Sequence, residues 1–231
     1  MPEGTPVQDP VFAQDPVSAQ DIEPSAAGPA AALAEAYREL GRAGLIAGSS
    51  GNVSLRVPDG MLISPTGTDP DRITAGSVVA MTLDRPAPGA SSEWALHAEL
   101  YRGRPEFAAV VHTHADACTA LACLGEGLPL FHYSVLAFGG DVRCAPYVTF
   151  GTPALAQLAA EAMAGRSACL LANHGMIVAG RTLRAAVQGA RDLERLARQY
   201  LLARAAGVPR LLTQGEADAA IARFATYQRG A

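Results

Sequence analysis

An apolar run that ends in two closely spaced histidines constrains this chain more than any other feature. The run Ala108–Val111 is followed at once by His112, Thr113 and His114. In a strand, residues two apart project from the same face, so both imidazoles can reach one point in space. Two such nitrogens make up most of a site for zinc or another divalent metal. The pattern therefore predicts a strand that delivers metal ligands, although histidines with this spacing also occur in cores and loops.

Two other segments carry groups that would complete such a site. The apolar run Ala168–Asn173 leads directly into His174, and Glu93 stands at the start of a predicted helix. His97 follows Glu93 by four residues and shares its helix face, so it is either another ligand or a packing residue beneath Glu93. We favour packing, because the other three histidines already fill three positions around a metal. The role of His132 stays open.

The composition excludes several classes of protein. All 18 basic residues are arginine, so no lysine is present for a Schiff base, a pyridoxal-phosphate link or a Walker-type phosphate loop. The formal net charge is −4 and no basic stripe occurs, which argues against a nucleic-acid partner. No apolar stretch approaches membrane-spanning length. The cysteines are expected to be reduced and buried in a cytoplasmic protein; they are Cys118, Cys123, Cys144 and Cys169.

The pattern of short elements predicts one α/β domain whose sheet is largely antiparallel. The 231 residues, 49% of them hydrophobic, suffice for one substantial core. Residues 1–28 contain little to bury and are predicted to be a disordered tail. The predicted helices cover about residues 30–43, 93–102, 115–124, 153–164, 183–206 and 216–226. The predicted strands cover about residues 53–57, 61–64, 78–83, 108–112, 142–146, 168–173 and 176–179, the first two joined by a hairpin turn at Pro58–Gly60.

Three segments rich in hydroxyl groups and glycine have the chemistry of an anion site. They are Ser49–Ser54, Ser64–Thr68 and the pair Ser91 and Ser92, either of which is expected to cap the helix that follows. Backbone N–H groups at glycines and at a helix start can bind a phosphate monoester without a lysine. Each segment taken alone also fits an ordinary loop or a capped helix, and the sequence leaves that alternative open.

Read together, these segments resemble the class II aldolase/adducin family, and most closely its fuculose-phosphate aldolase members. The resemblance covers about residues 32–228, with the motifs in family order. They are Gly51-Asn-Val-Ser54, Gly60-Met-Leu-Ile-Ser-Pro-Thr-Gly67, Ser91-Ser-Glu-Trp94, Val111-His-Thr-His114, His132-Tyr133, Cys144–Thr152, Asn173-His-Gly175 and Phe224-Ala-Thr-Tyr227. The resemblance implies a single three-layer α/β catalytic domain over residues 29–231, with a central, mainly antiparallel sheet flanked by helices.

The resemblance also implies a role for each matching residue. His112, His114 and His174 would bind Zn2+, with Mn2+, Co2+ or Fe2+ as alternatives, and Glu93 would ligate the metal until substrate displaces it and it becomes the acid/base. Tyr133 matches a tyrosine that reaches the active site of a neighbouring subunit in a fourfold-symmetric (C4) homotetramer. The phosphate-binding positions are Gly51, Asn52, Thr66, Gly67, Ser91 and Ser92. The positions that shape the aldehyde pocket are Phe150, Phe224 and Tyr227.

The implied reaction is the reversible cleavage of a phosphorylated ketose. L-Fuculose 1-phosphate or a related 5-deoxy-pentulose 1-phosphate would give dihydroxyacetone phosphate and a short aldehyde such as L-lactaldehyde. A Lewis-acidic metal fits a chain without lysine. The same scaffold also carries sugar-phosphate or sugar-acid decarboxylases, 4-epimerases, dehydratases and non-catalytic adducin-like modules. We expect Asp in place of Glu93 in an epimerase, an acid soon after His132 in a dehydratase, and lost metal ligands in a non-catalytic module.

Overall fold

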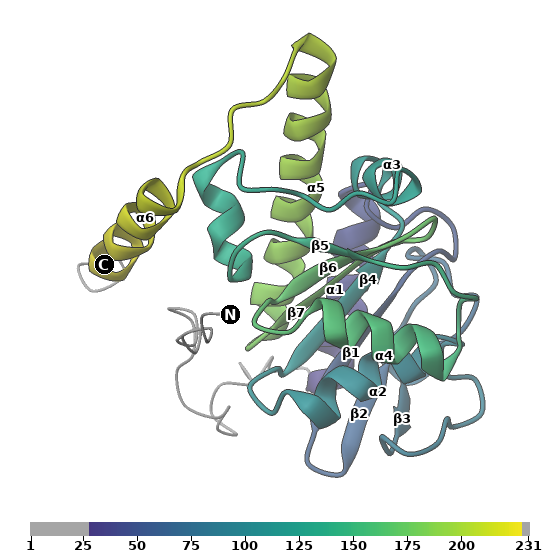
Figure 1. Ribbon diagram of the computed structural model, residues 1–231. Coiled ribbons are helices and arrows are strands. Elements are labelled where there is room, and N and C mark those ends of the chain that lie inside the picture. Colours follow the sequence, from purple (N-terminus) through teal and green to yellow (C-terminus); the bar gives the residue numbers. More distant parts are fainter. Residues whose placement is uncertain (1–27, 228–231) are drawn as a thin grey trace.

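The structure, a computed structural model, describes residues 28–227 (Figure 1). The predicted tail therefore lies outside the described residues, apart from Gly28. Within that range, seven strands form a single sheet in the order β3-β2-β1-β4-β7-β6-β5. The strands are β1 (Asn52–Val57), β2 (Gly60–Ile63), β3 (Val79–Met81), β4 (Ala109–Thr113), β5 (Arg143–Ala145), β6 (Ala168–Leu171) and β7 (Gly175–Gly180). The helices are α1 (Pro29–Arg42), α2 (Trp94–Gly103), α3 (Asp116–Cys123), α4 (Pro153–Ala162), α5 (Leu183–Ala206) and α6 (Gln214–Tyr227).

The sheet is mainly antiparallel, as predicted. All neighbouring strands run antiparallel except β5 and β6. The predicted hairpin joins β1 to β2 through residues 58 and 59. Strands β4 and β7 pair at the centre of the sheet, with Thr113 opposite Met176. This pairing places the end of β4 beside the turn that precedes β7.

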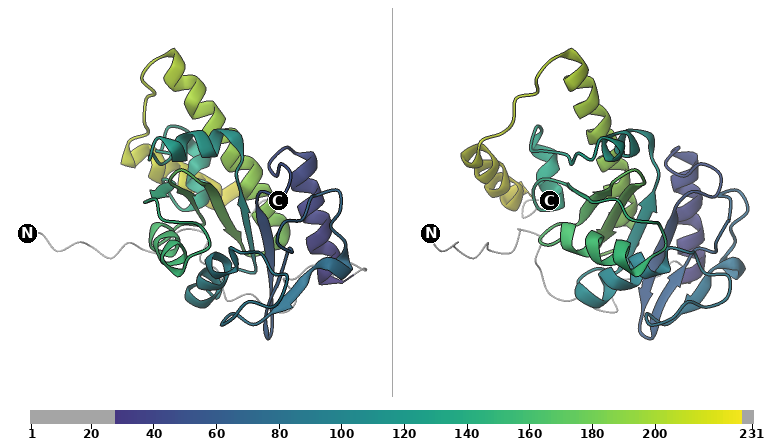
Figure 2. Two further views of the ribbon diagram at one scale, coloured as in Figure 1. Left: turned by 90° about the vertical axis from the view of Figure 1, so that its right-hand side faces the viewer. Right: turned by 45° about the vertical axis from the view of Figure 1, so that its right-hand side comes forward.

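Helices cover both faces of the sheet, which gives the predicted three layers. Helices α2 and α4 lie in front of the sheet in Figure 1, and α1 and α5 lie behind it; the two views of Figure 2 show the same layers from other sides. Helix α5 presents a buried stripe spaced by three and four residues, which is the period of a helix that packs along one side. That stripe consists of Ala186, Val187, Ala190, Leu193, Leu196 and Ala197.

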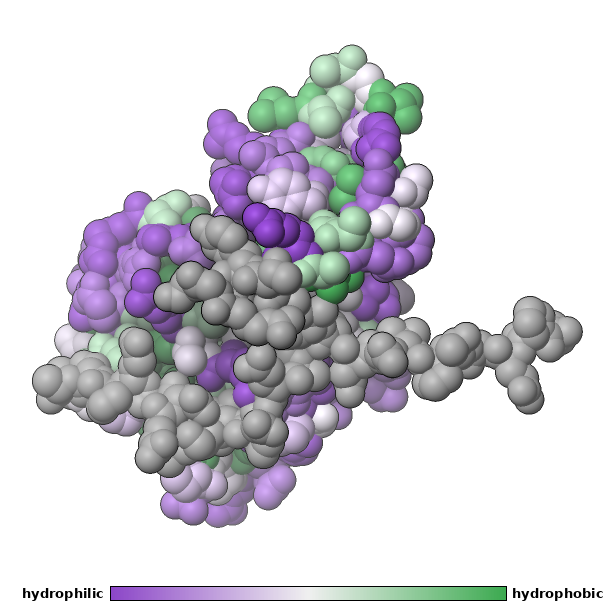
Figure 3. Space-filling view, turned by 90° about the vertical axis from the view of Figure 1, so that its left-hand side faces the viewer, coloured by the Kyte–Doolittle hydropathy of each residue, from purple (hydrophilic) through white to green (hydrophobic). Residues whose placement is uncertain are grey.

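The end of α5, the loop after it and α6 form an arm that projects from this body (Figures 1 and 2). An ion pair between Arg204 and Glu126 holds its base, and the Leu212 amide donates to the Leu130 carbonyl oxygen at 2.8 Å. Apolar surface gathers at the top of Figure 3, where the end of α5 and the loop lie. Its exposed apolar side chains are Leu202, Val208 and Leu211.

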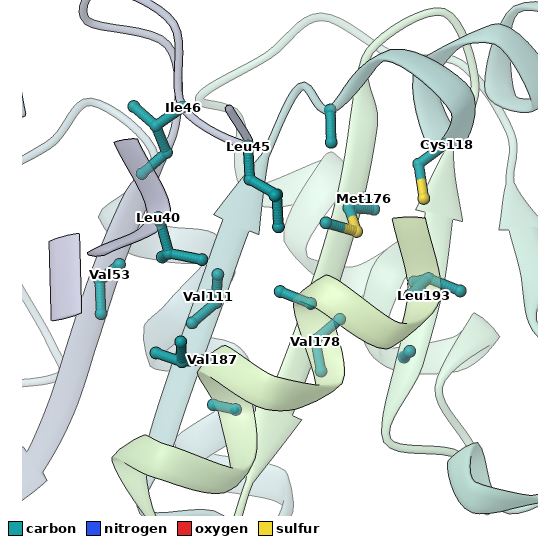
Figure 4. Close-up of a cluster of buried hydrophobic side chains, with 14 of the residues drawn as sticks. Leu40, Leu45, Ile46, Val53, Val111, Cys118, Met176, Val178, Val187 and Leu193 are labelled. Atoms are coloured by element: carbon teal, nitrogen blue, oxygen red, sulfur yellow. The ribbon is translucent and has the colours of Figure 1, made fainter. Parts of the chain in front are cut away.

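One apolar core fills the space on each side of the sheet. On the α1 and α5 side, Val111 and Val178 of the sheet face Leu40 and Leu193 of the helices (Figure 4). On the α2 and α4 side, the core includes Ile177 of the central strand β7. A fully buried leucine or valine of this kind contributes about 1.5–3 kcal/mol relative to an exposed one. The two cores hold the central strands rigidly between the helix layers.

Three local predictions from the sequence differ from the structure. Helix α2 has Glu93 as its N-cap, with no side-chain cap, because Ser91 Oγ instead accepts from the Glu93 amide within the preceding turn. Cys123 is exposed, whereas Cys118 and Cys169 are buried and Cys144 is partly buried; all four are free thiols, as predicted. The segment Tyr133–Phe138 forms a 3-10 helix, η2, that sequence periodicity did not indicate.

No helix among residues 28–227 is long and apolar enough to cross a membrane.

Helix α3 is capped by a side chain from another helix, which generates a stability prediction. Glu194 of α5 accepts hydrogen bonds from the Ala117 and Cys118 amides at 2.8 and 2.9 Å. A carboxylate at a helix N-terminus satisfies free amides and the helix dipole. We expect Glu194→Ala to lower the free energy of unfolding by about 1–2 kcal/mol in denaturant titrations at fixed protein concentration. Glu161→Ala, on the exposed face of α4, is the control and should change it by less than about 0.5 kcal/mol; equal losses in both would contradict the capping role.

Candidate metal centre

Three imidazoles and one carboxylate converge at the end of the central strands. Glu93 Oε2 lies 3.0 Å from His112 Nε2, and Glu93 Oε1 lies 3.2 Å from His174 Nε2. His112 Nε2 and His114 Nε2 are 3.0 Å apart. The four ligand atoms all lie within 4.8 Å of one another. The structure thus brings together the four side chains that the sequence analysis singled out as metal ligands.

Each element contributes to this convergence for a local reason. His112 and His114 stand two apart where β4 ends, so they face the same side of the sheet. His174 lies in the β6–β7 turn, where Asn173 adopts a positive φ of 54°, a conformation that asparagine tolerates better than most residues. A Cβ on Gly175 would stand 2.4 Å from the Thr113 carbonyl oxygen, so only glycine permits β7 to start this close to β4.

Burial and charge set the ionisation of the four groups. Burial acts to raise the pKa of Glu93, but His112 and His174 oppose it and hold the pKa well below its usual range. Burial, with the like charges of the neighbouring histidines, lowers the pKa of His114 to about 4. Burial also acts to lower the pKa of His112, but the Glu93 carboxylate outweighs it and raises that pKa. The site therefore favours an ionised carboxylate.

The donor set fits a divalent metal of the zinc type. Among the described residues, Glu93 Oε1 is buried without a hydrogen bond, although His174 Nε2 lies 3.2 Å away. Such a state is costly for a carboxylate oxygen unless a cation compensates it. His112 Nδ1 lies 2.8 Å from the Met176 carbonyl oxygen, so it carries the proton and leaves the Nε2 lone pair directed at the cluster. Three imidazole nitrogens and one carboxylate are ligands that zinc, and also Mn2+, Co2+ and Fe2+, accept.

The three segments predicted to bind an anion are tied together near the cluster. The Tyr37 hydroxyl donates to the carbonyl oxygens of Gly51 and Thr68 at 3.3 and 3.1 Å, which joins the first segment to the second. The Thr66 amide donates to the Gly89 carbonyl oxygen at 2.9 Å, which joins the second to the chain entering Ser91. Thr66 thus has its hydroxyl, and not its amide, to offer a ligand. The predicted residues at these places are Gly51, Asn52, Thr66, Gly67, Ser91 and Ser92.

Two of these residues are held by tight local geometry. A Cβ on Gly51, whose φ is 105°, would stand 2.8 Å from the His112 carbonyl oxygen, so this glycine lets the first segment touch β4. The Asn52 side chain is buried and donates to Glu93 Oε2 at 3.2 Å. One hydrogen of the Asn52 NH2 group is engaged there, and the second is left to donate to a ligand.

The predicted aromatic residues lie farther out on the surface. Tyr133 is 53% exposed on η2, where it stacks on His132 at 4.5 Å and contacts Phe224 of α6. Phe150 is 65% exposed in the loop before α4. A Cβ on the next residue, Gly151, would stand 3.1 Å from the Ser92 carbonyl oxygen, so this loop runs close to Ser92. Tyr227 lies at the end of α6, and its side chain is outside the described part of the chain. Within the described residues, the ring contacts of Tyr133 are with His132 and Phe224 and not with the cluster.

An open cavity of about 980 Å³ lies at the opposite end of the sheet from the cluster. Its lining includes Gly180, the last residue of β7, and Phe107, just before β4. The cluster lies where β4 ends and β7 begins, so the cavity and the cluster are separated by the length of these strands. The chemistry of the cluster is therefore not carried by this cavity.

Sequence reasoning placed His97 beneath Glu93 but did not find its hydrogen-bond partners. His97, Ser54 and Tyr101 form hydrogen bonds with one another, and His97 also contacts Asn52. Burial lowers the pKa of His97 to about 3, which keeps its ring neutral. The preference for His97 as a packing residue rather than a ligand agrees with this position. The alternating polar residues of β1 were the available signal.

Comparison with known proteins agrees with the site. Residues 31–201 match the family described as Class II Aldolase and Adducin N-terminal domain. A 5-methylthioribulose-1-phosphate/5-deoxyribulose-1-phosphate aldolase of Rhodospirillum rubrum is 43% identical over 84% of this chain and 90% of that protein. The L-fuculose phosphate aldolase of Escherichia coli is 40% identical over 82% of this chain and 90% of that protein. A solved structure of an L-fuculose 1-phosphate aldolase superposes with a TM-score of 0.81 at 35% identity, over 84% of this chain and 95% of that one.

The chain therefore belongs to the class II aldolase and adducin family. Within that family it is a class II aldolase, which is a lyase. Class II aldolases of this kind depend on a metal and act on ketose 1-phosphates. The cluster of Glu93, His112, His114 and His174 is its candidate metal centre.

Loss of one imidazole tests the centre directly. We expect His114→Ala to reduce the metal that remains bound after dialysis well below one ion per chain, because the site loses one of its four ligands. Elemental analysis after dialysis measures this. His132→Ala removes a histidine outside the cluster and should keep its metal. Full metal content in His114→Ala would contradict the assignment.

Proposed function

We propose that this protein is a zinc-dependent aldolase that cleaves L-fuculose 1-phosphate, or a related 5-deoxy-pentulose 1-phosphate, to dihydroxyacetone phosphate and a short aldehyde. The observation that carries the proposal is the position of the Glu93 carboxylate. It is buried among three imidazoles, it is held ionised, and it begins the helix that follows Ser91 and Ser92. The proposed acid/base, Glu93, thus directly follows two of the proposed phosphate-binding residues, Ser91 and Ser92.

Separate groups of residues would bind the phosphate, hold the metal and transfer protons. The phosphate would be held by backbone amides, by hydroxyl groups and by one side-chain amide. The residues proposed for this are Gly51, Asn52, Thr66, Gly67, Ser91 and Ser92. His112, His114 and His174 would hold the metal, which would supply Lewis acidity to the oxygens of the substrate. Glu93, ionised at rest, would take up a proton when substrate binds and deliver it to C3 as the C3–C4 bond breaks. The proton that leaves the C4 oxygen through the Tyr133 phenol balances the one that C3 gains.

The aldehyde side of the substrate distinguishes the possible ketoses. Phe150, Phe224 and Tyr227 are proposed to enclose the group beyond C4, and apolar rings suit a methyl or methylthio end better than a hydroxyl end. The related aldolases from Rhodospirillum rubrum and Escherichia coli are named for substrates with such ends. This supports 5-deoxy-pentulose and 6-deoxy-hexulose 1-phosphates ahead of ribulose 1-phosphate.

We also propose that the active enzyme is a C4 homotetramer with active sites between subunits. Tyr133 is half-exposed beside the arm, and it contacts Phe224 of α6. Apolar side chains that are exposed in a single chain, among them Val208 at 99%, favour burial against a second copy. A ring with a head-to-tail interface would bring the Tyr133 surface of one subunit to the Glu93 cluster of the next.

The reaction is tested by release of dihydroxyacetone phosphate from four substrates. L-Fuculose 1-phosphate, 5-deoxyribulose 1-phosphate, 5-methylthioribulose 1-phosphate and ribulose 1-phosphate are compared with metal-loaded and chelator-treated protein. We expect metal-dependent release from the first three, with kcat/KM about tenfold or more above that for ribulose 1-phosphate, because a hydroxyl in an apolar pocket costs over 1 kcal/mol. No release from any of the four, with metal bound, would contradict the proposed reaction and favour a decarboxylase or epimerase.

The role of Tyr133 across an interface is tested with mixed subunits. Glu93→Gln and Tyr133→Phe alone should each fold and lose most turnover, because one removes the acid/base and the other the phenol proton. Equal amounts of the two are then unfolded and reassembled together. If Tyr133 serves a neighbouring subunit, about one quarter of the sites regain both wild-type groups and activity returns. If Tyr133 acts within its own chain, no mixed site is complete and activity stays absent.

A further inference from the structure

Helix α2 faces strand β1 through polar side chains, although this contact is fully buried. Glu93, His97 and Tyr101 follow one another at intervals of four along the helix, and Asn52 and Ser54 are two apart on the strand. Four helical residues rise about 6 Å and two strand residues about 6.6 Å. The two rows therefore have nearly the same spacing, and their side chains interleave.

The interleaved side chains make one continuous line of hydrogen bonds. Asn52 Nδ2 lies 3.2 Å from Glu93 Oε2, and Asn52 Oδ1 contacts His97 Nε2. His97 Nδ1 lies 2.7 Å from Ser54 Oγ, which lies 2.8 Å from the Tyr101 hydroxyl. Each of the five residues is at most 6% exposed. The line begins at the candidate metal centre and ends deep between α2 and the sheet.

The chemistry of its members gives this line a single direction. A carboxylate only accepts, so Asn52 presents its NH2 group to Glu93 and its oxygen to His97. His97 must then donate from Nε2, and because its ring is neutral, Nδ1 must accept. Ser54 therefore donates to Nδ1 and accepts from Tyr101. Every donor in the line points toward Glu93.

At the end of the line farthest from Glu93, the groups around Tyr101 favour a hydroxyl that donates to Ser54. The Ala108 carbonyl oxygen lies 3.5 Å from the Tyr101 hydroxyl and already accepts from the Arg56 amide at 2.7 Å, so Ser54 is the better acceptor. The Arg56 guanidinium lies 4.6 Å above the Tyr101 ring and donates to the Tyr101 carbonyl oxygen at 2.7 Å. Burial raises the pKa of Tyr101, so its hydroxyl keeps its proton.

We propose that Asn52, His97, Ser54 and Tyr101 form a one-way hydrogen-bond chain that holds the Glu93 carboxylate at the angle from which it exchanges a proton with substrate. His97, in its Nε2–H tautomer, is the central positioning residue. This inference rests on the proposed function of Glu93 as the acid/base. The hydrogen-bond chain fixes Glu93 Oε2 through Asn52. It leaves Glu93 Oε1 directed at the metal centre, and Oε1 has no hydrogen bond within the described residues.

A purely structural role explains this arrangement less well. Apolar side chains of similar size would pack α2 on β1 without the cost of burying four polar groups. Buried polar groups that are fully paired and aligned instead specify one geometry. Since the one ionised group of the line is Glu93, the geometry that is specified is that of the carboxylate.

The tautomer is measured on the wild-type protein, loaded with zinc, by long-range proton–nitrogen NMR of the histidine rings. We expect a neutral His97 ring with its proton on Nε2 at neutral pH, and the signal is assigned by its loss in His97→Gln. A proton on Nδ1, or a charged ring, would overturn the proposal. This readout needs no turnover, so it stands even if none of the ketose phosphates is cleaved.

Kinetic measurements then test whether the hydrogen-bond chain acts on catalysis through Glu93. We expect His97→Leu to lower kcat about 10- to 100-fold with KM within about twofold, and with an equal slowing of deuterium exchange at C3 of dihydroxyacetone phosphate. His97→Gln, which keeps a donor for Asn52, should recover most of kcat. Ser54→Ala, which removes little volume, should lower kcat about fivefold, the equivalent of one hydrogen bond. Metal content should stay unchanged in all three.

The outcomes separate the two proposals. Wild-type kcat in both His97→Leu and Ser54→Ala, or equal changes in kcat and KM without recovery in His97→Gln, would overturn the positioning role while the aldolase reaction stands. Absence of cleavage and of C3 exchange in the wild-type protein would overturn the proposed function alone, and the tautomer would still decide the direction of the chain. If His97→Leu fails to fold, Ser54→Ala and His97→Gln decide the question.

Discussion

The antiparallel pairing of β4 with β7 is the interaction on which the rest of the site depends. It places Thr113 opposite Met176, so the histidines at the end of β4 meet the turn that carries His174. The glycine at position 175 permits this contact, because a side chain there would collide with the Thr113 carbonyl. Two apolar cores, one on each face, then hold the paired strands in place. The position of the candidate metal centre thus follows from sheet register and backbone contact.

The cost of placing charge in this interior explains the polar surroundings of Glu93. An ionised carboxylate that is 6% exposed must be compensated by cations or hydrogen-bond donors. His112 and His174 face it on one side, and Asn52 donates to it on the other. A metal ion at the cluster would compensate it further, and it would also satisfy Oε1. Metal binding and the ionised state of the acid/base are therefore two consequences of the same arrangement.

Much of the fold and the metal cluster could be predicted from the sequence, because local rules determine them. The two-residue spacing of His112 and His114 sets a common face, and turn signals at Pro58–Gly60 set the hairpin. The polar line beneath Glu93 could not be predicted, since it joins segments more than 40 residues apart in the chain. The alternation of polar and apolar residues in β1 is typical of a half-exposed strand, yet α2 buries its polar face. The cap of α2 was predicted wrongly for a related reason: Ser91 bonds to the Glu93 amide within the turn before the helix.

The central claim is that three imidazoles and one carboxylate surround a single metal ion. X-ray absorption at the zinc edge, on protein loaded with about one zinc per chain, measures the ligands directly. The structure predicts a shell of nitrogen and oxygen atoms at about 2.0–2.1 Å, with a multiple-scattering signature of three imidazoles that is reduced in His114→Ala. A sulfur ligand at about 2.3 Å, or a shell without imidazole scattering, would contradict it.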